Sequence, residues 1–185
     1  MLFRSFNPAF SGIIMLLLVL SACSSLPGKR VKEPFRGSAY ESNNRFLRAT
    51  GKGESMQDNV ARSKADIDAK TILAGQVNTT MQQVADQYLG ETAKGSASDV
   101  ADKFQSLARQ VMNTQLADIR KVGEEKFYNK KENRYIVYVA YELKKSAMFS
   151  FMKKQAKIEG KLTEAQQAMV EKILDEQISK SESEN

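Results

Sequence analysis

A long apolar stripe with helical spacing follows the first quarter of the chain. Its members recur at three- and four-residue steps: Val60, Ala61, Ala65, Ala69, Ile72, Leu73, Val77, Met81 and Val84. This period places the apolar side chains on one face of an α-helix. Ser55, with Asp58 three residues later, is typical of a helix N-cap, and Gly90 marks the expected break. Because many members are alanine, we expect this helix to approach a sheet closely.

Farther along, the apolar period changes from helical to extended. Residues 116–128 and 135–143 are two extended runs separated by the polar sequence NKKENR, and the second run, YIVYVAYEL, is dense in β-branched and aromatic residues. This pattern predicts a long β-hairpin, bulged at Gly123. Both faces of the second run are apolar, which predicts cover on each side or a contact between two copies.

Shorter patterns predict the remaining elements. Residues 46–50 fit a strand, with Gly51-Lys52-Gly53 as a strand-to-helix turn, and residues 99–115 fit a second helix. After Lys144 we expect two helices broken at Gly160, with Thr163 capping the second. The last helix has a thin apolar stripe, formed by Ala165, Met169, Ile173 and Ile178.

The N-terminus has the pattern of an export signal. Arg4 precedes an unbroken apolar run from Ile13 to Leu20, which is eight residues long. A membrane-spanning helix needs roughly 18 apolar residues, so a basic start and a short apolar run indicate a secretory signal peptide.

The four residues Leu20-Ser21-Ala22-Cys23 are similar to a bacterial lipobox. The resemblance implies cleavage before Cys23, S-diacylglycerol on its sulfur and an acylated new amino terminus, with palmitate as a typical chain. Ser24 after the cysteine implies sorting to the outer membrane. The alternatives are a chance cysteine near an ordinary cleavage site or a free buried thiol. Exported proteins usually pair their cysteines or lack them, and Cys23 is the only one here, so lipidation explains it better.

Composition divides the chain further. Pro, Gly, Ser and Asn dominate residues 24–44, which predicts a flexible tether. The expected organisation is a signal peptide at 1–22, the lipidated cysteine and tether at 23–44, a folded domain at 45–145, C-terminal helices at 146–180 and a disordered tail at 181–185.

The net charge of +6 is concentrated late in the chain. Residues 144–161 contain six lysines and only one glutamate: Lys144, Lys145, Lys153, Lys154, Lys157 and Lys161. Such a cluster attracts anionic lipid or wall polymers, whereas a solvated surface is the simpler interpretation. Nucleic acid is not expected as a partner of an exported lipoprotein. Phe149 or Phe151 beside these lysines fits a lipid contact or packing onto the hairpin.

Motifs for catalysis are nearly absent. The chain has no histidine, and its one thiol is consumed by lipidation, which leaves no common general base, zinc ligand or thiol nucleophile. Ser150 and Lys153 have the Ser-x-x-Lys spacing of penicillin-recognising enzymes, without the other motifs of that class. We therefore expect a protein that is not an enzyme and has no cofactor or metal.

Together, the lipobox, the tether, FLRATGKGES and ARSKADIDAKTIL resemble the twenty-kilodalton outer-membrane lipoprotein family (Lpp-twenty). The later strand pair ending in YIVYVAYEL is also similar, so the resemblance covers about residues 44–145. It implies an α+β fold with a β-α-β-β core, in which a small antiparallel sheet packs against a long helix, somewhat dodecin-like. The C-terminal helices are additions to that core.

These features predict a non-catalytic bacterial outer-membrane lipoprotein, anchored by lipid on Cys23, at the periplasmic face or the cell surface. Its folded part is expected to bind another envelope component, either a protein or an anionic polymer. The alternative is a self-assembling structural module of the envelope, that is, a homo-oligomer.

Overall fold

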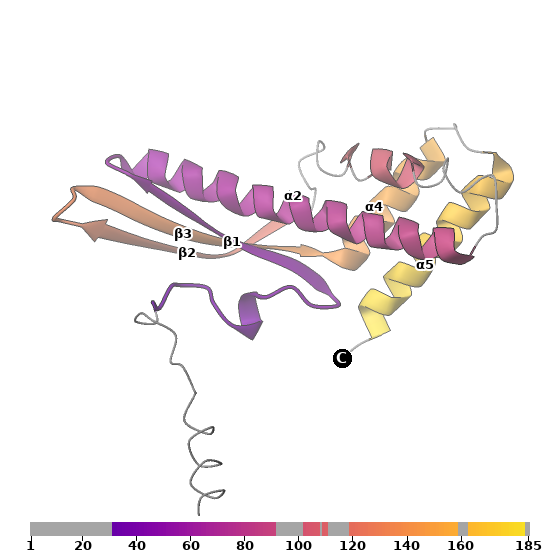
Figure 1. The fold of residues 1–185 in the computed structure, drawn as a ribbon, viewed down its shortest axis with the longest axis horizontal. Coiled ribbons are helices and arrows are strands. Elements are labelled where there is room, and N and C mark those ends of the chain that lie inside the picture. Colours follow the sequence, from indigo (N-terminus) through magenta and orange to yellow (C-terminus); the bar gives the residue numbers. More distant parts are fainter. Residues whose placement is uncertain (1–30, 92–101, 108, 111–118, 159–162, 184–185) are drawn as a thin grey trace, which may run out of the picture. The chain divides into compact units, whose positions relative to one another are not determined.

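The computed structural model describes residues 31–91, 102–107, 109–110, 119–158 and 163–183. The chain divides into two units, Met1–Lys32 and Glu33–Asn185. Every element below belongs to the second unit (Figure 1). This unit has an α+β fold with an antiparallel sheet and a long helix, as predicted.

Three antiparallel strands form the sheet, in the order β1-β3-β2. The strands are β1 (Phe46–Ser55), β2 (Ile119–Asn129) and β3 (Arg134–Lys144). The hairpin of β2 and β3 is as predicted, and the pairing register shifts between Lys121 and Gly123, where the bulge was expected. The β-branched and aromatic residues of β3 put it in the centre, because a central strand is buried on both faces.

The long helix, α2 (Asp58–Glu91), packs on one face of the sheet against β1 and β3. Here one prediction is wrong, because Gly51-Lys52-Gly53 is not a turn but the middle of β1, which continues to Ser55. A Cβ atom on Gly51 would lie 2.2 Å from the Ala65 carbonyl oxygen. Both glycines are therefore needed where helix and strand backbones touch.

The C-terminal helices are α4 (Lys145–Ile158) and α5 (Glu164–Ser183). A helix of 34 residues is about 51 Å long, and a ten-residue strand spans about 34 Å, so α2 extends past the sheet. Side chains from the extending part of α2 and from both C-terminal helices share one core, with Met81, Met152, Val170 and Leu174 almost fully buried. The C-terminal helices thus complete the fold that the sheet begins (Figure 1).

The prediction that Thr163 caps the last helix is confirmed, whereas the predicted apolar stripe of that helix is incomplete. The Thr163 Oγ1 accepts a hydrogen bond from the Gln166 backbone amide (3.3 Å), and Gln166 Oε1 accepts one from the Thr163 amide (3.0 Å), so Thr163 caps α5. Phe149 packs in the core. The predicted stripe of α5 misses Val170 and Leu174, its most buried apolar residues, whereas Ala165 is exposed.

The structure describes only part of the second helix, which was predicted over residues 99–115. Residues 102–107 and 109–110 are helical, and Phe104 and Leu107 are fully buried, as expected for its apolar side. The rest of that prediction, like residues 184–185 of the expected tail, lies outside the described residues; α5 itself continues to Ser183.

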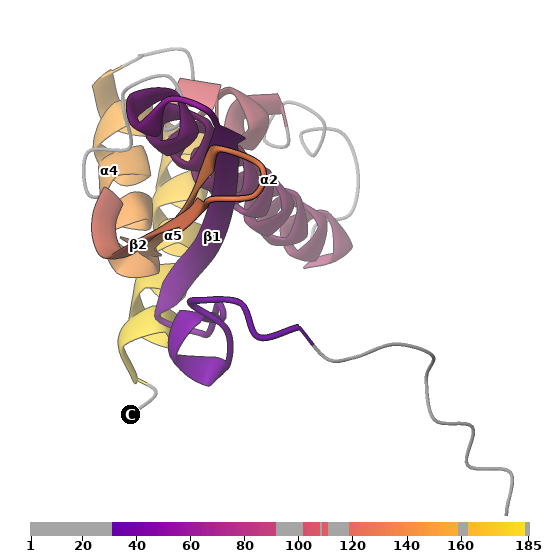
Figure 2. The same cartoon turned by 90° about the vertical axis from the view of Figure 1, so that its left-hand side faces the viewer.

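The folded unit begins at Glu33, twelve residues before the expected boundary. We call residues 33–42 the strap, because they cross the sheet face opposite α2 (Figure 2). The strap contains the short 3₁₀ helix η1 (Ser38–Tyr40). The Thr50 hydroxyl donates a hydrogen bond to the Phe35 carbonyl (3.1 Å), and the Phe35 ring contacts the position of Gly123. The Phe35 and Tyr40 rings stack edge to face, with their centroids 5.1 Å apart. Two packed aromatic rings give the strap apolar surface to bury, although its average composition is polar.

Candidate functional site

A basic pocket, the sheet pocket, lies on the strap side of the sheet, where β1 begins and β3 ends. Its volume is about 360 Å³, and its lining residues are Arg45, Phe46, Arg120, Glu142 and Lys144. The register pairs Phe46 with Lys144 and Arg120 with Glu142. Because alternate strand residues share a face, these four side chains all project away from α2.

Glu142 is the only carboxylate of the sheet pocket, and it is 6% exposed. Arg48 Nε donates to its Oε2 at 3.0 Å, and Arg120 Nη2 donates to its Oε1. Burial alone would raise the pKa of Glu142, but the hydrogen bonds and positive charges of Arg120 and Arg48 outweigh it and lower the pKa. The carboxylate is therefore ionised at neutral pH, and each of its two oxygens accepts a hydrogen bond from one guanidinium group.

Cations outnumber this carboxylate. Arg45, Arg120 and Lys144 line the pocket with Glu142, and Arg48 pairs with Glu142 beside them, so four cations and one carboxylate give a local net charge of +3. Within the described ranges, Arg45 and Lys144 form no ion pair. Arg45 and Arg48 lie 5.9 Å and 4.9 Å from the Phe46 ring centroid, and such stacking orients a guanidinium without neutralising it. The pocket is thus equipped to bind an anion.

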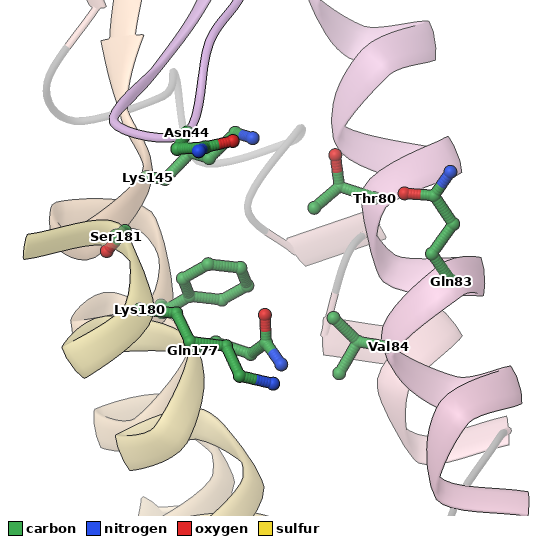
Figure 3. A pocket seen from close by; sticks show the side chains of 9 residues that line it. Asn44, Thr80, Gln83, Val84, Lys145, Gln177, Lys180 and Ser181 are labelled. Atoms are coloured by element: carbon green, nitrogen blue, oxygen red, sulfur yellow. The ribbon is translucent and has the colours of Figure 1, made fainter. Parts of the chain in front are cut away.

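A second pocket, the helix cleft, lies between α2 and the C-terminal helices (Figure 3). Its volume is about 300 Å³. From α2 come Thr80, Gln83 and Val84, and from α5 come Gln177, Lys180 and Ser181. Asn44, Lys145 and the buried Phe149 complete the lining. Burial lowers the pKa of Lys145, because water is partly excluded from its ammonium group.

The two pockets share a wall. Arg45 and Lys144 line the sheet pocket, while their chain neighbours Asn44 and Lys145 line the helix cleft. The Lys145 backbone amide donates a hydrogen bond to the Arg45 carbonyl (2.9 Å), which joins the two segments. The two pockets are therefore lined by adjacent residues of the same two segments.

The structure disperses the six lysines of the predicted anionic-surface contact. Lys144 and Lys145 fall in different pockets, and Lys154 is exposed on α4. Lys153 Nζ pairs with Asp175 at 2.6 Å, and Lys157 Nζ pairs with Glu171 at 3.4 Å, so α5 neutralises both. Lys161 lies outside the described residues.

Sequence reasoning missed the residues that accompany Lys144 in the sheet pocket. Arg45 and Arg120 are far apart in the chain, and only strand pairing brings them together. One signal was available, because Glu142 interrupts an otherwise apolar strand. A carboxylate in such a strand requires charged partners when buried.

The weak catalytic motif does not assemble. Ser150 Oγ donates to the Ser146 carbonyl at 2.8 Å, and Lys153 is occupied by Asp175, so these two side chains do not bond to each other. No cluster of potential metal ligands occurs among the residues described.

The predicted lipidation site, Cys23, lies outside the described residues. Within the part of the chain that the structure covers, no helix has the length and apolar character to cross a membrane. The chain matches no protein-family model, no characterised protein and no solved structure. The resemblance to the Lpp-twenty family therefore stays a prediction.

Proposed function

We propose that this protein is a non-catalytic, lipid-anchored outer-membrane lipoprotein that binds an anionic polymer of the cell envelope. The lipobox at residues 20–23 supports the lipid anchor and the outer-membrane localisation. One observation carries the binding role: three cations line the sheet pocket around a single buried carboxylate, and a fourth cation, Arg48, pairs with that carboxylate. The excess of positive charge favours phosphate or carboxylate groups.

The character of the sheet pocket favours a polymer over a protein partner. Arg45 and Lys144 are exposed, and Phe46 is half-buried. Protein interfaces instead have an apolar, desolvated centre surrounded by a polar rim. An open, cationic surface fits a flexible chain of repeated anions, which binds through charge and through many weak contacts.

The binding role is tested by sedimentation of residues 24–185 with purified cell wall. The variant Arg45→Glu/Lys144→Glu is expected to weaken binding at least about tenfold, because two charge contacts become repulsive. The variant Lys154→Glu/Lys172→Glu changes the net charge equally at exposed sites outside the pocket, and it should bind like the native chain. Equal loss in both variants would remove the pocket from the proposal, and capture of an envelope protein instead of wall would replace the polymer.

The lipid anchor on Cys23 and the membrane localisation have a separate test. Mass spectrometry of the native protein is expected to find an N-terminus at Cys23 that carries a diacylglyceryl group and an acyl chain. In Cys23→Ser, both additions should be lost and the protein should leave the membrane fraction. A native Cys23 with a free thiol would overturn the anchor and leave the sheet pocket unaffected.

Self-assembly remains the second candidate, and the two sheet edges bear on it differently. Side chains occupy the outer edge of β1: Asp68 Oδ2 accepts from the Lys52 amide (3.0 Å), and Gln76 Nε2 donates to the Arg48 carbonyl (3.0 Å). These contacts block pairing with another strand. The edge of β2 has no such cover among the residues described, and Phe127 and Tyr128 near its end are 46% and 47% exposed.

Light scattering on residues 24–185 separates the two candidates. A strict monomer at all concentrations is expected if polymer binding is the function. A concentration-dependent dimer that Phe127→Ser dissociates would favour assembly through β2.

A further inference from the structure

We infer that the helix cleft binds an anionic sugar, that is, a sugar ring with a carboxylate or phosphate beside hydroxyl and amide groups. This inference rests on the proposed function, since it identifies the class of polymer unit that the neighbouring sheet pocket would share. Nothing in the sequence pattern pointed to the cleft, because its lining comes from α2, α4, α5 and the segment before β1.

The charge of the cleft favours an anion. Lys145 and Lys180 both line it, and none of its nine lining residues is acidic. Neither lysine forms an ion pair with another described residue. Lys145 is half-buried, so its ammonium group has lost water without gaining a carboxylate. A ligand carboxylate or phosphate supplies the missing counter-charge, which is worth more in a partly desolvated site than in water.

The neutral polar groups of the cleft favour hydroxyls and amides on the same ligand. Figure 3 shows Thr80 and Gln83 of α2 across the cleft from Gln177 of α5, with Asn44 at one end. Three side-chain amides offer both donors and acceptors, and a sugar ring presents hydroxyls that serve as both. A purely apolar ligand would leave these groups without partners, at a cost in binding free energy.

The apolar part of the lining and the volume limit the size of the ligand. Val84 and Phe149 are 5% and 2% exposed, so each presents only a small apolar surface. That surface suits the C–H face of a sugar ring or an acetyl methyl group. The volume of about 300 Å³ is at the lower end of ligand pockets, which are about 300–1,000 Å³, and therefore fits one or two sugar rings.

Calorimetric titration of residues 24–185 with three matched sugars tests the inference. Residues 33–185 make their own core, and circular dichroism checks that each variant keeps it. N-acetylmuramic acid carries a carboxylate and N-acetylglucosamine 6-phosphate a phosphate, whereas N-acetylglucosamine is neutral. We expect at least one acidic sugar to bind at least about tenfold more tightly than the neutral one, a difference typical of one charge-assisted contact. Whichever acid binds identifies the anionic group.

Lysine variants test whether the sugar binds in the helix cleft. Lys145→Met and Lys180→Met keep the aliphatic stems and remove the charges, so each should weaken the acidic sugar at least about fivefold and leave the neutral sugar unchanged. Lys154→Met, on the exposed side of α4, is the control and should change nothing. Equal binding of acidic and neutral sugars, or no saturable binding, would overturn the inference. Loss of sugar binding in Arg45→Glu/Lys144→Glu but not in Lys145→Met would also overturn it, by moving the sugar to the sheet pocket. Wall binding that persists without sugar binding would remove only this inference, not the proposed function.

Discussion

The two faces of the sheet are built in opposite ways. On the α2 face, helix and strand backbones touch, because glycines of β1 meet the alanines Ala61, Ala65 and Ala69, which are all fully buried. On the strap side, long side chains stand on the strands: Arg48, Glu142 and Arg120 form a charged network, and the Phe35 ring covers Gly123.

The difference explains where a binding site can form. Two backbones in contact have no side chains that can rotate to make room, so the α2 face is rigid and closed. The strap side holds flexible side chains and a ten-residue segment that packs from outside, which leaves room for the sheet pocket. Four substitutions test this contrast, and they follow in order of decreasing effect on stability.

The largest effect is expected for Gly53→Ala on the α2 face. The new Cβ would lie 2.0 Å from the Ala61 carbonyl oxygen and 2.5 Å from the Ala65 backbone nitrogen. Since neither backbone atom can move alone, the whole helix must shift, and we expect a loss of about 4 kcal/mol or more in the free energy of unfolding. Urea denaturation measures it. A loss below about 1 kcal/mol would mean that the α2 face is not rigid.

Glu142→Gln on the strap side is expected to cost about 1.5–3 kcal/mol, because Arg48 and Arg120 lose a charged, buried partner. The pKa of Glu142 is lowered on folding from its ordinary value of 4.5. Its ion pairs therefore contribute fully above about pH 4.5, and their contribution is lost as the pH falls through the lowered pKa. The stability difference between native and variant chains, measured by thermal unfolding from pH 7 to 3, should shrink with acid. A difference that stays constant over this range would contradict the assignment.

Gly123→Ala is the counterpart of Gly53→Ala on the other face. Its Cβ would lie 2.3 Å from the Phe35 ring, a distance between the 2.0 Å and 2.5 Å contacts of Gly53. Here the obstacle is a side chain on the strap, so the ring can move away, and we expect a loss of only about 1–2 kcal/mol. Limited proteolysis should then cut the strap faster than in the native chain. A loss as large as that of Gly53→Ala would remove the contrast between the faces.

Gly75→Ala gives the smallest effect and the opposite sign. Gly75 is an exposed residue of α2, and a Cβ there would meet nothing within 4 Å. Alanine restricts the unfolded chain and favours the helix, so we expect a gain of about 0.5–1 kcal/mol. The gain would appear as a higher urea midpoint with an unchanged slope. A loss at this position would show that the exposed side of α2 is covered in solution.

Local patterns in the sequence were sufficient to predict most of the helices and strands of this protein. Helical and extended periods predicted α2, the β2–β3 hairpin, its bulge at Gly123 and the cap at Thr163, because each depends on residues a few positions apart. The same local reasoning placed Gly51-Lys52-Gly53 in a turn, because glycine is common in turns and a local pattern does not show a helix lying on the strand. Similarly, the Pro-, Gly-, Ser- and Asn-rich composition of residues 24–44 predicted a flexible tether and did not reveal that two aromatic rings of the strap pack together.

Which charged side chains lie close together depends instead on how the helices and strands pack. Arg120 lies in β2, Glu142 lies in β3 and Arg45 immediately precedes β1, and the antiparallel register brings these segments together at one pocket. The lysine cluster that looked continuous in the sequence is divided instead, since α5 pairs with Lys153 and Lys157 and the wall between the pockets separates Lys144 from Lys145. The reason is physical: a period of two or 3.6 residues sets the direction of neighbouring side chains, whereas proximity between distant residues follows from how helices and strands pack.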